Sequence, residues 1–278
     1  MQFLKNLLAS ILGTLIAIFL AFVFLLIIIA GIASSFDSTD AVNVNEKSIL
    51  TIKLQKPITD RSPNQFDLAA AFDLDATAIG LNKILASISA AKDDERIKGI
   101  SIEQTFLQSG MSQTQAIRDA LSDFKQSGKF IYAYHDFYTQ KDYYLASVAD
   151  SVFVHPEGGV DIRGLASEVL YLKEFQDITG LHMQVIRSGA YKSAVEPFLV
   201  DEMSDENRQQ IKSLLDSFWK EMVGKIEERT ALNAKKINQI ASDLDASVAT
   251  NALKIGVVDN TLLRNEYREF LRNQMELD

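Results

Sequence analysis

Residues 130–154 read FIYAYHDFYTQKDYYLASVADSVFV, and this stretch decides the fold class. Residues 130–134 are apolar and aromatic and predict a strand, residues 143–149 predict a short helix, and residues 151–154 predict a second strand. Because a strand, a helix and another strand in direct succession favour parallel pairing through a helical crossover, the stretch predicts an α/β fold.

The same alternation extends to both sides of this stretch. Before it, the pattern predicts strands at residues 48–54 and 97–102 and a helix at residues 79–91. It also predicts a helix that a capping box of Ser112 and Gln115 opens and Gly128 ends. After it, we expect a strand at residues 182–187 and helices at residues 166–179, 204–229, 233–242 and 248–254. Residues 47–261 are therefore expected to form one α/β domain, followed by a charged linker helix at residues 262–278.

The N-terminus carries the clearest physical signal. No charged residue lies between Asn6 and Phe36, and residues 11–30 supply about the 20 apolar residues that a membrane span needs. We therefore expect a transmembrane anchor at residues 1–33 and a polar tether at residues 34–46. The small residues around Ile32 resemble a cleavage site, so a cleaved signal peptide is the alternative, although its apolar stretch would be shorter.

Charges on either side of the span predict its orientation. Lys5 precedes the apolar run, whereas Asp37 and Asp40 follow it. The positive-inside tendency then places the short N-terminus in the cytoplasm and the large domain on the other side of the membrane.

Composition excludes several classes of function. The formal net charge is −9, and beyond residue 36 there are 27 basic against 37 acidic side chains, which argues against general binding of nucleic acid. Cysteine is absent, so a disulfide framework or a thiolate nucleophile is impossible. The three histidines lack metal-ligand spacing, so we expect neither a metal site nor a cofactor.

Lys192 is the candidate catalytic residue. It stands in residues 189–198, GAYKSAVEPF, among mostly small and apolar neighbours that could keep it dry enough to act as the base of a serine hydrolase. The alternative is a surface lysine paired with Glu196. That pair has the weaker helical order of charges, and Pro197 biases Glu196 away from helix, so the residues alone leave both readings open.

Two other motifs give weaker evidence for a functional site. His135 and Asp136 resemble part of a hydrolytic dyad, but adjacent residues at the end of a strand point in opposite directions. Gly158 and Gly159 lack the spacing of a nucleotide-binding loop and predict a turn.

Taken in order, several short motifs resemble the N-terminal half of the long form of the signal peptide peptidase A (protease IV) family. They are residues 3–7 (FLKNL), 96–100 (RIKGI), 124–129 (FKQSGK), 143–150 (YYLASVAD), 156–158 (PEG), 191–198 (YKSAVEPF) and 202–207 (EMSDEN). The likeness runs from the anchor to about residue 259, and the lysine motif is its most specific part.

The resemblance implies a ClpP/crotonase-like fold and a membrane-bound serine peptidase that degrades cleaved signal peptides. It implies a Ser–Lys dyad in which Lys192 is the general base, while the serine comes from a homologous C-terminal half. It also implies a tetramer at the bacterial inner membrane, with the domain facing the periplasm.

The chain departs from that pattern at the nucleophile. The family's serine motif corresponds to residues 140–144, QKDYY, with Gln140 in place of the serine. The family's Pro-Gly-Gly turn has no match either, and residues 105–110, TFLQSG, stand near its place. We therefore expect half of an enzyme, which is either a fragment or truncated product or a chain that needs a partner carrying the serine.

Two further hypotheses compete with this interpretation. A membrane-tethered assembly or peptide-binding module without turnover fits the missing serine equally well. A small-molecule lyase of the crotonase type fits less well, because of the anchor and the missing oxyanion glycines.

Overall fold

The computed structural model describes residues 2–36, 44–61, 78–103, 106–184, 186, 189 and 192–276. They belong to two units, Met1–Val44 and Asn45–Asp278. The first unit consists mainly of one helix, α1 (Gln2–Phe36), whose stretch Gln2–Ile28 is long and apolar enough to cross a membrane.

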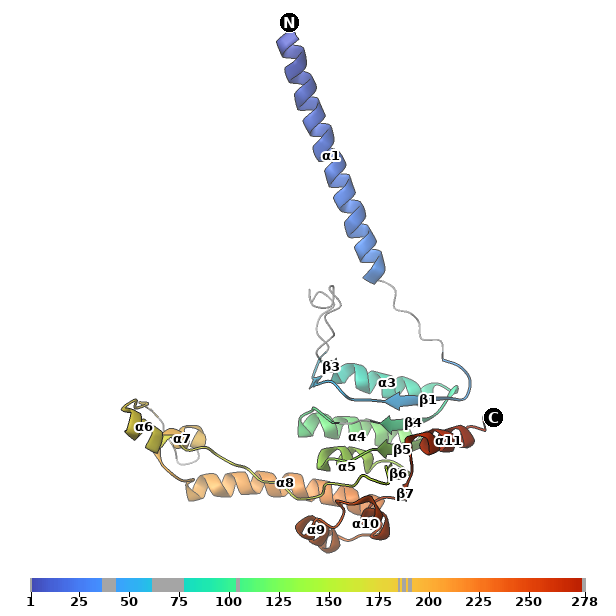
Figure 1. Ribbon diagram of the computed structural model, residues 1–278, viewed down its shortest axis with the longest axis vertical. Coiled ribbons are helices and arrows are strands. Elements are labelled where there is room, and N and C mark those ends of the chain that lie inside the picture. Colours follow the sequence, from blue (N-terminus) through green and yellow to red (C-terminus); the bar gives the residue numbers. More distant parts are fainter. Residues whose placement is uncertain are drawn as a thin grey trace. The chain divides into compact units, whose positions relative to one another are not determined.

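A five-stranded sheet forms the centre of the second unit (Figure 1). Its order is β1-β4-β5-β6-β7, and every neighbouring pair is parallel, which confirms the predicted α/β class with helical crossovers. The strands are β1 (Ser48–Ile52), β4 (Ile97–Glu103), β5 (Phe130–His135), β6 (Ser151–Val154) and β7 (Asn260–Thr261). A separate parallel pair consists of β2 (Ile58–Thr59) and β3 (Ile79–Gly80).

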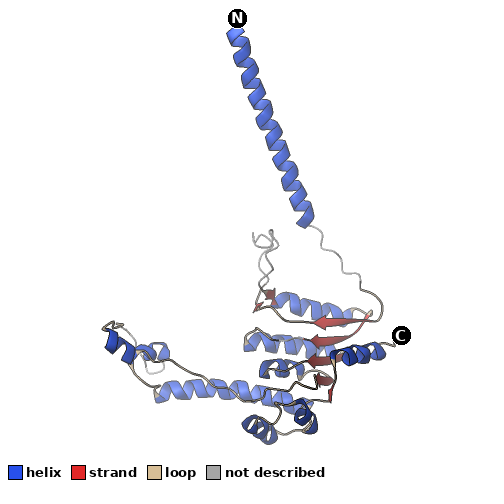
Figure 2. Ribbon diagram, viewed as in Figure 1, coloured by secondary structure: helices blue, strands red, loops and turns tan. Residues whose placement is uncertain are grey.

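The two faces of the sheet are covered differently. One face is aromatic, and α11 (Arg264–Gln274) packs on it by stacking Tyr267 on Tyr134, with ring centroids 4.8 Å apart. On the other face alternate residues such as Ile131 are fully buried, as expected from the two-residue period of a strand. The crossover helices are α3 (Leu81–Asp93), α4 (Met111–Lys125) and α5 (Gln140–Ala146), drawn in blue beside the red strands in Figure 2.

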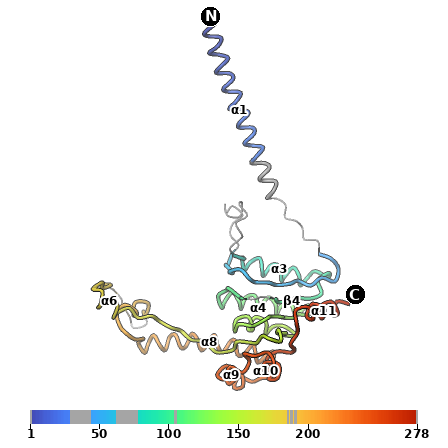
Figure 3. Tube along the Cα trace, in the orientation of Figure 1, coloured from blue at the N-terminus to red at the C-terminus, as the bar shows by residue number. Residues whose placement is uncertain are grey.

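After β6 the chain leaves the sheet and returns through a long helix (Figure 3). We call residues 163–207 the arm. It contains α6 (Lys173–Thr179), the 3-10 turn η1 (Ser193–Val195) and α7 (Glu196–Leu199), and it leads into α8 (Asp205–Arg229). The helices α9 (Ala234–Asp243) and α10 (Ala249–Lys254) follow before β7.

The arm has no apolar core among the residues that the structure describes. Its buried side chains are Gln176, Glu196 and Asn207, all of which are polar. Large apolar side chains of the arm are instead exposed, and they include Leu170, Phe175, Ile178, Leu181, Met183 and Ile186. Polar contacts therefore decide the local geometry of the arm.

Two elements predicted in the arm are wrong. The helix expected at residues 166–179 begins only at Lys173, and it ends at Gly180 in the left-handed conformation as predicted. The strand expected at residues 182–187 is absent from residues 182–184 and 186, the part of it that the structure describes. Alternating apolar residues suffice for a strand only where a neighbouring strand can pair with their backbone groups.

Two predicted helix starts were also too late. The helix α4 begins at Met111 with Gly110 as its N-cap, because Gln113 Oε1 accepts the Gly110 N–H at 2.9 Å, and Ser112 is not the cap. The helix expected from residue 143 begins at Gln140, because the Thr139 hydroxyl caps it by accepting from the Asp142 N–H at 3.2 Å.

Candidate functional site

Lys192 lies in the arm, immediately before η1. Its backbone is extended away from helical values, at φ −90° and ψ 77°, and its side chain is exposed. Within the described part of the chain, the Lys192 side chain forms neither a hydrogen bond nor an ion pair. The expected apolar wall is therefore not closed around Lys192 by the described residues of this chain.

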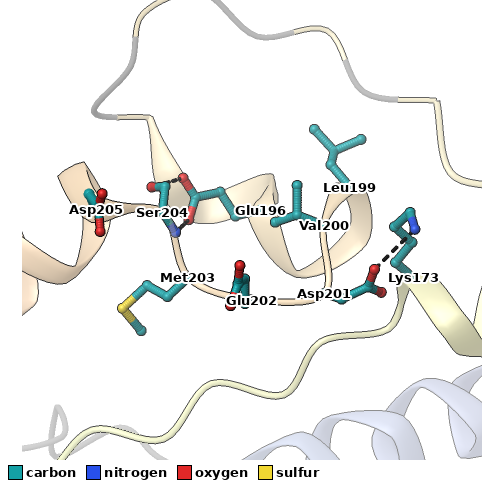
Figure 4. Close-up of a pocket in the computed structure, with 9 residues that line it drawn as sticks. All are labelled: Lys173, Glu196, Leu199, Val200, Asp201, Glu202, Met203, Ser204 and Asp205. Carbon is teal, nitrogen blue, oxygen red and sulfur yellow. Dashed lines mark hydrogen bonds and ion pairs between the residues drawn. The ribbon is translucent and has the colours of Figure 1, made fainter.

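Glu196 does not pair with Lys192, so the surface ion pair considered from the sequence is wrong. Its side chain is only 2% exposed and accepts a hydrogen bond from the Ser204 hydroxyl at 2.5 Å and from Asn207 Nδ2 at 3.0 Å. Figure 4 shows Ser204 beside Glu196, at the point where the chain enters α8. The carboxylate is thus engaged by donors from the start of α8.

The same region contains a hollow of about 670 Å³. On its other side Lys173 Nζ lies 3.1 Å from Asp201, and this hydrogen bond raises the pKa of Lys173 (Figure 4). Since both side chains are largely exposed, the pair contributes little to stability.

Gln140, which we expect at the position of the family's serine, is the first residue of α5. Its Oε1 accepts hydrogen bonds from two consecutive backbone N–H groups, those of Arg163 at 2.9 Å and Gly164 at 3.0 Å. Its Nε2 donates to the Gly164 carbonyl at 3.0 Å. Gly164 has φ +84°, a conformation that favours glycine. The carboxamide is therefore a clamp on this turn, and it has no nucleophilic oxygen to offer.

A largely apolar groove of about 410 Å³ adjoins Gln140. It is lined by Phe106, Leu107, Met111, Thr139, Gln140, Lys141, Asp161, Arg163, Gly164, Leu165, Phe218 and Met222. The groove brings together the start of α5, the start of the arm and the C-terminal half of α8.

The segment at residues 106–110, near the expected place of the family's glycine turn, is bound to α5. Leu107 donates its backbone N–H to Asp142 Oδ1 at 3.1 Å, and Lys141 Nζ donates to the Ser109 carbonyl at 2.6 Å. Residue 105, just before this segment, lies outside the described residues. The Leu107 N–H is thus already engaged by a side chain of the chain itself.

Lys192 and Gln140 are not brought together in this chain. The segment that follows Lys192 is bound to α8 through Glu196, which accepts a hydrogen bond from Asn207. Gln140 instead contacts α8 at Met222, with its Nε2 3.8 Å from the sulfur. At a rise of about 1.5 Å per residue, these two points on α8 are about 22 Å apart. A base at residue 192 could not serve a nucleophile at residue 140 of the same chain in this arrangement.

His135 and Asp136 point in opposite directions, as predicted. His135 is buried and its Nδ1 lies 3.0 Å from the Phe137 carbonyl, while Asp136 is exposed and pairs with Arg264 at 2.9 Å. Burial lowers the pKa of His135 because the charged form loses hydration. The pair does not form a catalytic dyad.

The Gly158–Gly159 turn is a point of close backbone approach. A Cβ at Gly158 would lie 1.9 Å from the Asp136 carbonyl oxygen, and one at Gly159 would lie 2.0 Å from that of Ser247. These glycines are required by packing, which agrees with the predicted turn.

Sequence reasoning missed the roles of Glu196 and Gln140. The sequence predicts the helix at residues 204–229, and the structure shows Ser204 as its N-cap, but no spacing rule links this turn to Glu196. Gln140 was recognised only as the absence of a serine, because its partner, the turn at Gly164, lies far along the chain.

The sequence was compared with protein families and with curated proteins. Residues 123–278 match the family model described as Peptidase family S49. The chain is 37% identical over 155 residues to "Protease 4" of Haemophilus influenzae, which covers 55% of this chain and 25% of that protein. It is 28% identical over 226 residues to "Protease 4" of Salmonella typhi, covering 78% and 37% of the two chains.

A plant protein is similar as well. "Serine protease SPPA, chloroplastic" of Arabidopsis thaliana is 27% identical over 187 residues, which cover 67% of this chain and 26% of the relative. The chain thus matches between a quarter and somewhat more than a third of the length of these relatives. The family match and the parallel sheet together confirm the expected ClpP-like class of fold.

Proposed function

The chain belongs to peptidase family S49, and on this premise we propose that it is the base-supplying half of a membrane-anchored serine peptidase. Its peptidase domain spans residues 47–261, and Lys192 is the general base. The nucleophilic serine comes from a homologous C-terminal half.

One observation supports this division above all others. Gln140 stands where the family's motif has its serine, and its carboxamide is bound to the Arg163–Gly164 turn. The Lys192 side chain, by contrast, is exposed and forms no hydrogen bond or ion pair within the described residues, so it is available to a second polypeptide. The chain therefore carries the proposed base but lacks the serine nucleophile at residue 140.

The proposed chemistry is acyl transfer. When the second half covers Lys192, loss of water favours its neutral amine, the form that can accept a proton. Lys192 Nζ then takes the proton from the serine hydroxyl as the serine oxygen attacks the peptide carbonyl. It returns the proton to the leaving amine, and water later releases the acyl group by the same route.

The apolar helix and the family support the proposed location and substrate. In the proposal α1 spans the bacterial inner membrane once at residues 1–33, and the polar tether at residues 34–46 leads to a periplasmic domain. Residues 262–278, which contain α11 (Arg264–Gln274), are proposed as the linker to the second half. The substrates are cleaved signal peptides, and the assembly is a homo-tetramer.

The direct test compares the purified chain with the same chain plus a half that carries the serine. We expect no hydrolysis of an apolar fluorogenic peptide by the chain alone, and turnover sensitive to serine-directed inhibitors when both halves are present. Robust inhibitor-sensitive hydrolysis by the chain alone would overturn the proposal, because the nucleophile would then lie elsewhere in it.

A peptide-binding module without turnover is the second candidate. The apolar groove of about 410 Å³ beside Gln140 favours it, since a peptide side chain could be buried there. Binding of the fluorogenic peptide without hydrolysis, even with the serine-carrying half present, would support this alternative.

A further inference from the structure

Glu196 lies at the junction between the lysine segment and α8. Three donors from the start of α8 converge on its carboxylate: the Ser204 hydroxyl at 2.5 Å, the Ser204 N–H at 3.4 Å and Asn207 Nδ2 at 3.0 Å. The Ser204 hydroxyl in turn accepts from the Asn207 N–H at 3.2 Å. The first turn of α8 is therefore organised around one carboxylate.

A buried carboxylate at this place needs a reason. Burial of a charge is costly unless donors replace its lost water, and here three donors from two residues at the N-terminal end of α8 do so. The positive end of the 25-residue α8 stabilises the negative charge further. Because the arm has no buried apolar side chain among its described residues, this network is the main fixed point on that side of the arm.

Backbone hydrogen bonds connect the network around Glu196 to the segment that begins at Lys192. The Glu196 N–H donates to the Ser193 carbonyl and closes η1, whose N-terminal flanking residue is Lys192. The Glu196 carbonyl accepts from the Val200 N–H at 3.1 Å and closes α7. The two short helical turns thus meet at Glu196.

A second set of hydrogen bonds, donated by residues at the start of α6, holds α7 from its other side. Leu172 donates its N–H to the Pro197 carbonyl at 2.6 Å, and Gln176 Nε2 donates to the Phe198 carbonyl at 2.9 Å. Gln176 is itself buried and accepts the Met183 N–H at 2.7 Å. The segment after Lys192 is therefore held between α6 and α8.

We propose that Glu196 is a positioning residue for Lys192: its carboxylate, anchored on Ser204 and Asn207, fixes the backbone from which the base reaches the serine of the second half. This inference rests on the proposed function of Lys192. Glu196 touches neither Lys192 nor the reacting atoms. It acts by holding η1 and α7 against the start of α8.

Three variants test the proposal. Glu196→Ala removes the carboxylate, and Glu196→Gln keeps its length and one acceptor oxygen. Asn207 can turn its own amide oxygen toward the new NH₂ group, so Gln should restore much of the anchor. Glu202→Gln is the matched control, because Glu202 borders the same hollow but is exposed.

The first measurement is amide hydrogen exchange in the full chain. In Glu196→Ala we expect residues 196–200 to exchange at least about tenfold faster, with the sheet unchanged, because the local anchor is lost. Glu196→Gln should lie near the wild type, and Glu202→Gln should match it. Unchanged exchange in Glu196→Ala would overturn the inference whatever the activity assay shows.

The second measurement is turnover with the serine-carrying half present, normalised by active-site titration. A misplaced base lowers kcat by at least about tenfold in Glu196→Ala and leaves KM within about threefold, with recovery in Glu196→Gln. Full kcat in Glu196→Ala, in an enzyme that Lys192→Met inactivates, would contradict the positioning role. Full kcat in Lys192→Met would instead contradict the proposed function. Failure of the positioning role and failure of the proposed function are therefore distinguishable.

Discussion

At the residue scale, three polar side chains differ both in their chemistry and in their surroundings. The side chain of Lys192 is exposed and forms no hydrogen bond or ion pair within the described residues, the Glu196 carboxylate is buried among donors, and the Gln140 carboxamide is bound to a turn. Only the first is available to a second polypeptide. Residue type and environment together therefore agree with the proposed base at Lys192, the anchor at Glu196 and the clamp at Gln140.

His135 gives a residue-scale prediction for stability against pH. Burial lowers its pKa in the folded chain below the value of about 6.5 expected in the unfolded chain. The contribution of neutral His135 to the free energy of unfolding is therefore fully present above about pH 6.5. It is lost as the pH falls, because unfolding then takes up a proton. We expect His135→Gln to lose less stability than the wild type between about pH 7 and pH 5. Urea unfolding at several pH values measures this, and parallel profiles would contradict it.

At the scale of elements, the sequence predicted the sheet well and the arm poorly. The runs at residues 97–102, 130–134 and 151–154 are strands, because each carries enough apolar residues to be buried on its own. The arm lacks such a signal. Its geometry depends on single polar side chains, such as Gln176 and Glu196, whose partners are separated in sequence. Periodicity cannot reveal such contacts.

The clamp at Gln140 is tested by removing it. Gln140→Ala loses the hydrogen bonds to Arg163 and Gly164, so we expect a loss of about 1–3 kcal/mol in the free energy of unfolding. Gln140→Ser should lose a similar amount and should still give no hydrolysis by the monomeric chain, because Lys192 is remote along α8. Urea unfolding and a peptide assay check both statements, and a fully active Gln140→Ser monomer would contradict the separation of the two residues.

The glycine turn gives a second prediction for an element. In Gly159→Ala the new Cβ would meet the Ser247 carbonyl at 2.0 Å, so we expect a loss of about 1–3 kcal/mol from overpacking. Gly224→Ala in α8 is the control, because nothing lies within 4 Å of its Cβ position and alanine favours helix. Equal stability of the two variants would show that the turn at Gly159 can relax freely.

At the scale of the whole molecule, the chain combines one long apolar helix with one α/β unit. The proposal reads these as an anchor and half of a peptidase. Its base is placed on an arm whose large apolar side chains are exposed. Such a surface favours burial against another polypeptide, as the proposed assembly requires.

The orientation of the anchor is open to a direct test. Lys5 before the span and the acidic residues after it predict a cytoplasmic N-terminus. Protease added to cells with a permeabilised outer layer should therefore digest the domain, while a cytoplasmic marker protein stays intact. Protection of the chain beyond Ser34 would contradict this topology.

The central claim is that Lys192 supplies the base to a serine on another half. The most direct measurement is the kcat of the complete enzyme carrying Lys192→Met, which keeps the apolar stem of the side chain and removes the amine. We predict a fall in kcat of about 10²–10⁴-fold with KM nearly unchanged and unfolding unaltered, because general-base catalysis is lost at the transition state. Lys192→Arg should fail as well, since arginine stays protonated. Turnover near that of the wild type in Lys192→Met would contradict the claim and return Lys192 to the role of an ordinary surface residue.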